Sequence, residues 1–549
     1  RAVMSQLEKD SLEKTGLRSD VVTLYQGGLY HLYRYKKYTD VRLVFAPEKA
    51  IASFGGDVDN FEFPRFNLDI CFFRVYENDK PLQSTHYLKW SKSGPREGEV
   101  VFVSGHPGTT QRLETYERLR FRRDVMLPYI LARLRNREAS LLQFTARSPS
   151  HAKWAQKDLY SSANARKAFS GQYQGLLDSS ILAAKKTQEA ELVQTLQKLG
   201  QADTASMTRY CLDEIAAIQK KFQDFYREYM LLEVGDAFDS VLFKIARDLV
   251  RQKVELGKPN GERLREYRDS NKASLELQLY SPAPIYPELE VAKLATSLTF
   301  MAEQLGAEHF LVQQVLEGKS PVQRAFELVQ GSQLMDVDHR RTISRLKLSE
   351  LHQLNSDSMI HLIKTLDSQA RDLRRRYEET IEEPERQCYS VIANAKFAVY
   401  GTQLAPDATF TLRLAFGKVS GYEDGGKPVN YCTTFQGLYD RHQENGGTYP
   451  FDLPGRWLEN RQKLELNTPF NFVSTADTIG GNSGSPVVNK AGELVGVNFD
   501  RNRYGLVRNF VYTDTQARHI AVHSEAIREA LRKLYDVKPL LQELELELE

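Results

Sequence analysis

The sequence has few of the features that identify metal-binding, disulfide-rich or membrane-spanning proteins. Only 4 of its 549 residues are cysteine, and they lie far apart without a Cys-x-x-Cys pair: Cys71, Cys211, Cys388 and Cys432. This spacing argues against a zinc site and excludes a dense disulfide framework, so we interpret the cysteines as small buried hydrophobic residues. No run of about 18 apolar residues occurs, which excludes an ordinary transmembrane helix.

An excess of charge of either sign is also lacking. The 74 Lys and Arg residues nearly balance the 72 Asp and Glu residues. The balance gives no argument for binding to nucleic acid or to an anionic membrane. The chain starts at Arg1 without a charged and then apolar leader. We therefore expect a processed or truncated piece whose targeting signal lies outside this sequence.

The predicted type of secondary structure changes twice along the chain. With 549 residues, it exceeds what one hydrophobic core usually holds, so two or three domains are expected. Long charged segments with 3.6-residue periodicity occupy residues 111–395 and predict a helical domain. Short runs typical of strands lie on both sides of it: Asp40–Ala46, Asp69–Tyr76, His86–Trp90, Glu99–Ser104, Lys396–Tyr400, Thr409–Val419, Glu493–Phe499 and Asn509–Thr513. Ile70 to Phe73 form a continuous apolar run, which predicts a strand buried on both faces.

Residues 480–488, Gly-Gly-Asn-Ser-Gly-Ser-Pro-Val-Val, carry the strongest chemical signal. A serine between glycines before an apolar strand is how a chymotrypsin-type protease presents its nucleophile. Gly481 allows the backbone to turn so that its N–H and that of Ser483 form an oxyanion hole. Gly484 keeps the hydroxyl of Ser483 open to substrate. The alternative is a polar Gly/Ser turn between two strands.

A nucleophilic serine needs an imidazole base and an acid that orients the base. Asp69 is the candidate orienter because it stands at the start of an apolar strand, where a carboxylate needs a partner. Spacing alone leaves a turn-capping aspartate equally possible. Among the 11 histidines, His31 resembles a surface residue of a short strand and His106 a turn residue. We therefore expect the catalytic histidine to lie outside this sequence.

The chain resembles a known family, the bacterial chymotrypsin-fold dipeptidyl-peptidases of serine-peptidase family 46, which includes dipeptidyl-peptidases 7 and 11. The similarity spans nearly the whole sequence in order. The segments that carry it are Tyr38–Val44, Phe54–Asn60, Phe63–Arg74, Gly105–Gly108, Asn164 with Lys167 and Gly171, Thr409–Gly417 and Gly480–Asp500. The resemblance implies an α+β multidomain fold, a chymotrypsin-like double β-barrel with a large inserted helical domain. The expected parts are residues 1–110, the remainder of the first barrel; 111–395, the helical cap; and 396–549, the second barrel with a C-terminal helix.

Carried over by position, the resemblance makes Ser483 the nucleophile and Asp69 the orienter. It implies that Asn60, Asn164 and Asp500 hold the α-ammonium of the substrate, where a carboxylate and amide oxygens suit the charge and its N–H donors. Such a clamp fixes cleavage after the second residue. An Asx turn at Asn60 and a strand-end turn at Asp500 are the alternatives. Phe61 stands where the family usually has tryptophan, and can still form a wall of the amine pocket.

Arg501 follows the clamp aspartate and is expected to select the second residue of the substrate. Arginine there resembles the branch of the family that prefers Asp or Glu, because a buried guanidinium pairs with a carboxylate. The alternative is a solvent-exposed arginine. The predicted reaction removes dipeptides from free N-termini of oligopeptides and needs neither metal nor organic cofactor. The family resemblance also implies a homodimer that is periplasmic or secreted.

Two other functions stay open. A chymotrypsin-fold endoprotease of the HtrA or glutamyl-endopeptidase type also carries Gly-Asn-Ser-Gly, but would leave Asn60 and Asp500 without a role. A peptide-binding pseudoprotease would account for the missing histidine. As residues 1–549 alone, the chain is expected to be catalytically impaired, because Ser483 lacks a base.

Overall fold

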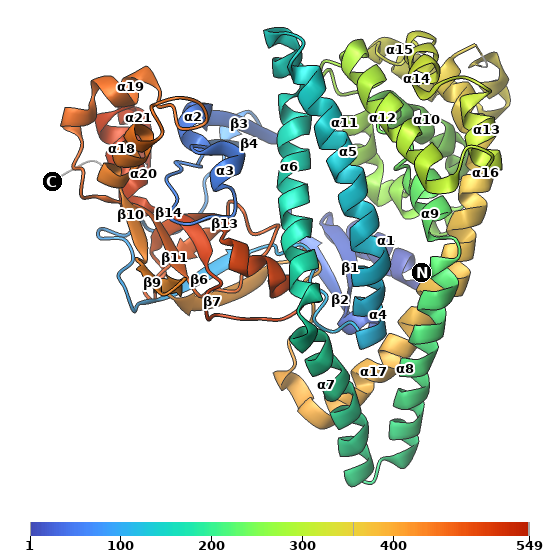
Figure 1. Ribbon diagram of the computed structural model, residues 1–549, viewed down its shortest axis with the longest axis horizontal. Coiled ribbons are helices and arrows are strands. Elements are labelled where there is room, and N and C mark those ends of the chain that lie inside the picture. The colour runs from blue at the N-terminus through green and yellow to red at the C-terminus, as the bar shows by residue number, and fades with distance from the viewer. Residues whose placement is uncertain (1, 355, 547–549) are drawn as a thin grey trace. The chain divides into compact units, whose positions relative to one another are not determined.

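The computed structural model describes residues 2–354 and 356–546 (Figure 1). The chain divides into two compact units, each assembled from three stretches of sequence. The first unit comprises Arg1–Lys36, Thr115–Phe169 and Leu182–Ala405. The second comprises Lys37–Glu114, Ser170–Ile181 and Pro406–Glu549.

The first unit is mainly helical, as the periodicity of residues 111–395 predicts. An N-terminal hairpin, β1 (Arg18–Leu24) and β2 (Leu29–Tyr35), belongs to it as well. No helix of the described chain is both long enough and apolar enough to cross a membrane. Its helices, with residues 170–181 of α6 and α7 assigned to the second unit, are α1 (Ala2–Thr15), α4 (Tyr116–Phe121), α5 (Leu127–Thr145), α6 (Pro149–Leu177), α7 (Ser179–Lys198), α8 (Ala202–Gln223), α9 (Tyr226–Glu228), α10 (Val241–Leu256), α11 (Lys272–Leu279), α12 (Pro287–Leu305), α13 (Phe310–Leu316), α14 (Pro321–Gln330), α15 (Val337–Arg345), α16 (Ser358–Tyr377) and α17 (Glu383–Tyr400).

Buried ion pairs hold the helices of the first unit together beside its apolar core. Arg251 on α10 donates two hydrogen bonds to Glu233, of 3.1 and 2.6 Å. Its Nε also donates to Asp367 on α16 at 2.6 Å. The side chains of Arg251 and Glu233 are only 5% and 7% exposed. A charge this deeply buried requires its partner, because water no longer compensates it.

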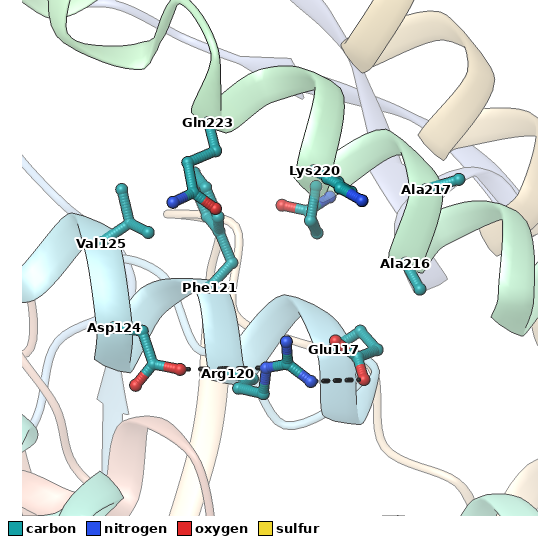
Figure 2. A pocket seen from close by; sticks show the side chains of 10 residues that line it. Glu117, Arg120, Phe121, Asp124, Val125, Ala216, Ala217, Lys220 and Gln223 are labelled. Atoms are coloured by element: carbon teal, nitrogen blue, oxygen red, sulfur yellow. Dashed lines mark hydrogen bonds and ion pairs between the residues drawn. The ribbon is translucent and has the colours of Figure 1, made fainter.

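A groove of about 500 Å³ lies between α4 and α8 of this unit (Figure 2). Phe121 and Arg120 line it, and Arg120 pairs with Glu117 at 3.1 Å and with Asp124 at 3.8 Å. All of its lining residues belong to the first unit, whereas Ser483 belongs to the second. The groove and the candidate nucleophile therefore belong to different units.

The second unit is built on a seven-stranded antiparallel sheet of strand order β10-β11-β14-β13-β12-β6-β7 (Figure 1). Buried Val101, Val487 and Val495 pack on this sheet. A second cluster around Trp457 and Phe470 includes residues of α20. The elements are β3 (Asp40–Phe45), α2 (Lys49–Ala52), α3 (Gly56–Asp59), β4 (Phe72–Glu77), β5 (Lys80–Pro81), β6 (Val100–Gly105), β7 (Arg413–Lys418), β8 (Tyr422–Asp424), β9 (Lys427–Val429), β10 (Cys432–Thr434), α18 (Phe435–Glu444), α19 (Gly455–Glu459), β11 (Pro469–Ser474), β12 (Pro486–Val488), β13 (Leu494–Arg501), β14 (His519–His523), α20 (Ser524–Lys533) and α21 (Lys538–Glu543).

The predicted combination of helices and antiparallel strands is confirmed, but the double β-barrel is not. The seven-stranded sheet ends at β10 and β7, which do not pair with each other in the described part of the chain. The other sheet of this unit with more than two strands has the order β3-β4-β5 and is also open. Closure of a barrel requires continuous pairing between its first and last strands. One isolated antiparallel bridge, between Val419 after β7 and Ser474 of β11, joins the two ends of the larger sheet, so a continuously paired barrel is not confirmed.

The prediction of a doubly buried strand at Ile70 to Phe73 is wrong. Strand β4 begins at Phe72, and the side chain of Phe73 is 58% exposed. On the paired strand β3, Val41 and Leu43 are also exposed. A three-stranded antiparallel sheet here has only one covered face, so a continuous apolar run does not imply burial on both sides.

Three of the other predicted strands do not form. Lys396–Tyr400 continues helix α17, because the buried Ile392 and Ala395 extend its helical face. His86–Trp90 contributes one isolated bridge, between Trp90 and Leu494. Asn509–Thr513 begins at the last residue of a 3-10 turn (Arg503–Asn509) and does not pair as a strand. Short apolar runs fit helix and strand equally well, so tertiary packing decides them.

The cysteines fulfil the expectation of burial only in part. Cys211 and Cys388 are buried in one apolar cluster of the first unit. Cys432 is half-buried, and Cys71 is exposed. The exposure of Cys71 has the same origin as that of Phe73, since both belong to the uncovered edge around β4.

Candidate active site

The loop between β11 and β12 presents Ser483 to solvent. Gly481 and Gly484 flank it with φ angles of +105° and +84°, which residues with a side chain rarely adopt. A Cβ at Gly481 would lie 2.5 Å from the carbonyl oxygen of His106, whereas a Cβ at Gly484 would meet no atom within 4 Å. Only glycine therefore fits at position 481, as the sequence predicts.

The side chain of Asn482 fixes this loop from the inside. It is buried, and its Oδ1 accepts a hydrogen bond of 3.0 Å from the N–H of Ile479. Nδ2 of Asn498 donates to the carbonyl oxygen of Asn482 at 3.0 Å. The N–H of Gly108 also donates to the carbonyl oxygen of Gly480 at 2.7 Å. The side chain of Ser483 takes no part in this support, and its hydroxyl bonds to β13 instead.

The hydroxyl of Ser483 donates a hydrogen bond of 3.2 Å to the carbonyl oxygen of Phe499. Phe499 lies in a β-bulge of β13, between Asn498 and Asp500. Bulges re-aim the side chains that follow them, and here those are Asp500 and Arg501. Within residues 2–354 and 356–546, the N–H groups of Gly481 and Ser483 donate to no other group. They are thus available to a substrate oxygen.

Asp69 lies just before β4, with its side chain open to solvent and crowded by protein on its other sides. This partial burial raises the pKa of Asp69 to about 6. The positive charge of Arg65 opposes the rise, and the negative charge of Asp500 adds to it. The three side chains therefore share one electrostatic environment.

No histidine of the described chain hydrogen bonds to Ser483 or to Asp69. His31 is exposed on β2 of the first unit, and His106 follows β6, as expected for surface and turn residues. His519 and His523 are buried on β14, where burial lowers their pKa values to about 3 and about 4. Nδ1 of His519 bonds to Oγ of Ser474 at 2.7 Å, which is a structural role.

The structure brings Asn60, Phe61 and Asp500 together. Asn60 is buried at the end of α3, and Phe61 follows with a left-handed φ of +61°. This conformation costs about 1–2 kcal/mol for a residue with a Cβ. It directs the N–H of Phe61 to Oδ2 of Asp500 at 3.2 Å. Oδ1 of Asp500 accepts the N–H of Arg501 at 2.8 Å.

Arg65 is a residue of this site that the sequence analysis missed. Its Nη1 donates to Oδ2 of Asp500 at 2.9 Å and to the carbonyl oxygen of Asp59 at 2.5 Å. Its Nε donates to Oδ1 of Asn67 at 3.0 Å. The side chains of Arg65 and Asp500 are 5% and 9% exposed. An arginine between the aromatic residues Phe63 and Phe66 was the available signal, because a buried guanidinium needs acceptors.

Arg501 is buried, contrary to the solvent-exposed alternative. Its Nη1 donates to Oδ1 of Asn509 at 3.2 Å, and it forms no ion pair within the part of the chain that the structure describes. Burial lowers its pKa to about 10, against the opposing charge of Asp500. Gly505 permits this placement, since its Cβ position lies 3.3 Å from the side chain of Arg501.

Asn164, the remaining predicted clamp residue, lies on α6 in the first unit. Its side chain is half-buried. The other candidates, Asn60, Asp69, Ser483 and Asp500, belong to the second unit.

Curated proteins similar to this chain are dipeptidyl-peptidases. An "Asp/Glu-specific dipeptidyl-peptidase" of Capnocytophaga gingivalis is 26% identical over 591 residues, which cover 99% of this chain and 78% of the relative. A "Dipeptidyl-peptidase 7" of Phocaeicola vulgatus is 25% identical, covering 97% of this chain and 76% of the relative.

Solved structures show the same fold. The crystal structure of Porphyromonas endodontalis DPP11 in complex with the dipeptide Arg-Glu matches with a TM-score of 0.80 and 21% identity, over 100% of this chain and 80% of that one. The family model described as Peptidase S46 matches residues 1–546. The chain therefore belongs to the peptidase S46 family.

Proposed function

We propose that this chain carries the nucleophile and the substrate-binding residues of a serine dipeptidyl-peptidase that prefers Asp or Glu at the second position of its substrate. The observation that carries the proposal is the position of Arg501. It is buried without an ion pair in the described chain and follows Asp500 on the strand whose Phe499 contacts Ser483. The names of the relatives, including several Asp/Glu-specific enzymes, support the same specificity.

In the proposed reaction, Oγ of Ser483 attacks the carbonyl carbon between the second and third residues of the peptide. The N–H groups of Gly481 and Ser483 bind the oxygen that becomes negative. The bond to the leaving amine breaks, the amine takes the proton that Oγ of Ser483 has lost, and an acyl-enzyme remains on Ser483. Water then hydrolyses this ester and frees the dipeptide. No metal or organic cofactor takes part.

The substrate ammonium is proposed to bind Asp500 and Asn60, with Phe61 beside it. The carboxylate supplies the charge and the amide oxygen accepts a remaining N–H group. The distance from this site to Ser483 then sets the cut after two residues. Arg501 is proposed to pair with the side-chain carboxylate of the second residue, as a guanidinium without an ion pair favours this partner.

Asp69 is proposed to orient the catalytic histidine in its ionised form. Because no described histidine contacts Ser483 or Asp69, we also propose that residues 1–549 alone hydrolyse peptides poorly. Further proposals from the family resemblance are two barrels of chymotrypsin type, a homodimer, and a periplasmic or secreted location. Light scattering of purified protein and cell fractionation test the last two.

The first experiment compares four fluorogenic dipeptidyl substrates, ending in Asp or in Leu, each with a free or an acetylated N-terminus. Cleavage confined to the free, Asp-ending substrate supports both the amine clamp and Arg501. Preference for Leu contradicts the role of Arg501, and indifference to acetylation indicates an endoprotease. Hydrolysis that persists in Ser483→Ala contradicts the nucleophile.

Calorimetry with Ala-Asp and Ala-Leu, free and acetylated, asks the same questions of the 549-residue chain without catalysis. Selective binding of free Ala-Asp is expected. Equal binding of all four ligands would contradict the proposed specificity.

A further inference from the structure

Two segments far apart in the sequence build the proposed amine site, and Arg65 joins them. Its Nη1 bonds to Asp500, which lies on β13, and to the carbonyl oxygen of Asp59, the residue before Asn60. The partners Arg65 and Asp500 are separated by 435 positions. The guanidinium also lies over the ring of Phe499, with its Cζ 5.5 Å from the ring centroid.

The carboxylate of Asp500 is held from three directions. Oδ2 accepts from Arg65 at 2.9 Å and from the N–H of Phe61 at 3.2 Å, while Oδ1 accepts from the N–H of Arg501 at 2.8 Å. A carboxylate offers about four acceptor positions. Three donors therefore fix its plane and leave about one position for a further donor.

Arg65 reduces the net negative charge that an ammonium ligand would meet at Asp500. Asp500 is not an isolated negative charge, because Arg65 already compensates it in a buried environment. Charge alone therefore does not explain how this carboxylate would attract an ammonium. Fixed geometry does explain it, because a preorganised acceptor costs little reorganisation when the ligand binds.

We infer that Arg65 is the positioning residue of the amine site, which holds the Asp500 carboxylate and the Asn60–Phe61 segment in the arrangement that accepts the substrate ammonium. The inference rests on the proposed function. Arg65 acts through Asp500 and Asn60 and does not itself contact the substrate.

The test measures the affinity of the 549-residue chain for Ala-Asp and for acetyl-Ala-Asp by calorimetry, in the unaltered protein and in Arg65→Met. We expect Arg65→Met to weaken binding of free Ala-Asp at least tenfold and to change binding of the acetylated ligand less than twofold. Arg65→Lys keeps the charge but lacks the planar fork that reaches several acceptors. It is expected to lose affinity for the free dipeptide as well, by severalfold.

Arg441→Met is the matched control. Arg441 bonds to Oδ1 of Asp59 at 2.8 Å, so it pairs with the same segment, but it has no bond to Asp500. Its ratio of free to acetylated affinity is expected to stay within twofold of the unaltered chain. Circular dichroism and thermal unfolding of each variant identify a fold defect, and Arg65→Lys keeps the test decisive where Arg65→Met does not fold.

Three results overturn the inference or its basis. An unchanged preference for the free dipeptide in Arg65→Met and Arg65→Lys contradicts the positioning role. Tighter binding of Ala-Asp in Arg65→Met also contradicts it, since that result means Arg65 merely competes with the ammonium for Asp500. Equal affinity of the unaltered chain for both ligands contradicts the proposed function instead, so the two failures are distinguishable.

Discussion

Nη1 of Arg501 donates a hydrogen bond of 3.2 Å to Oδ1 of Asn509, a neutral amide. Asn509 in turn donates from Nδ2 to the carbonyl oxygen of Thr109 at 3.2 Å. The amide therefore fixes the guanidinium without neutralising it. A buried cation that is held in place and lacks a carboxylate partner in the described chain is suited to a ligand that brings one.

Arg501→Gln is expected to reduce the preference for an acidic second residue. Loss of a charge-assisted hydrogen bond costs about 1.5–3 kcal/mol, which corresponds to about 10- to 150-fold in affinity. Calorimetry should show this loss for Ala-Asp and little change for Ala-Leu. An equal loss for both dipeptides would mean that Arg501 supports the fold and does not select the ligand.

Asp69→Asn is expected to raise the melting temperature at pH 7.5 and to leave it nearly unchanged at pH 4. Burial raises the pKa of Asp69 from 3.8 to about 6, so the folded state binds this proton more tightly than the unfolded state. The stabilisation is present below pH 3.8 and is lost as pH rises through about 6. Thermal unfolding at the two pH values measures the difference.

Asp178→Asn is the control for Asp69→Asn, because the pKa of Asp178 is shifted in the opposite direction. The N–H of Ser180 bonds to Oδ1 of Asp178 at 2.9 Å, and bonds from Ser180 lower the pKa of Asp178. Its ionised form therefore stabilises the folded state near neutral pH, and its replacement should not raise the melting temperature there. A lower melting temperature of Asp69→Asn at pH 7.5 would show that the Asp69 carboxylate makes favourable contacts which outweigh its desolvation.

Gly481→Ala and Gly484→Ala form a matched pair in the loop of Ser483. Both residues have positive φ, so alanine costs about 1–2 kcal/mol at each position. Only at Gly481 does the added Cβ also meet the carbonyl oxygen of His106, at 2.5 Å. We expect a total cost of roughly 2–5 kcal/mol for Gly481→Ala. Equal stabilities of the two variants in urea unfolding would contradict this packing.

Glu233→Gln tests the buried ion pairs of the helical unit. The change leaves Arg251 with Asp367 as its remaining carboxylate partner, and we expect a loss of about 3 kcal/mol in unfolding free energy. The exposed pair of Asp372 and Arg375 is the control, since its members are 59% and 66% exposed. Asp372→Asn should change stability by less than about 0.5 kcal/mol. Denaturant unfolding followed by circular dichroism compares them.

The sequence predicts the loop of Ser483 because its constraints are local. Gly481 and Gly484 encode positive φ angles, and neighbouring residues supply the geometry. Burial of Arg501 could be predicted only from its place after Asp500 in the family pattern. The bond between Arg65 and Asp500 joins residues 435 positions apart, and no periodicity or spacing encodes such a contact.

The fold was predictable to a similar extent. Long periodic segments give α10 and α16 directly, since their apolar residues recur at helical spacing. The five residues Lys396–Tyr400 fit either a strand or the end of a helix, and only the packing of α17 decides between them. Closed barrels depend on pairing between distant strands, which a single sequence does not reveal.

The exposure of Cys71 makes the protein suitable for fluorescence work without mutagenesis. A thiol-reactive dye should modify Cys71 first, because Cys211 and Cys388 are buried and Cys432 is half-buried. Burial also raises the pKa values of the thiols of Cys211, Cys388 and Cys432, which slows their alkylation. Since Cys71 lies two positions after Asp69, the emission of a dye attached there would report on peptides entering the site in real time.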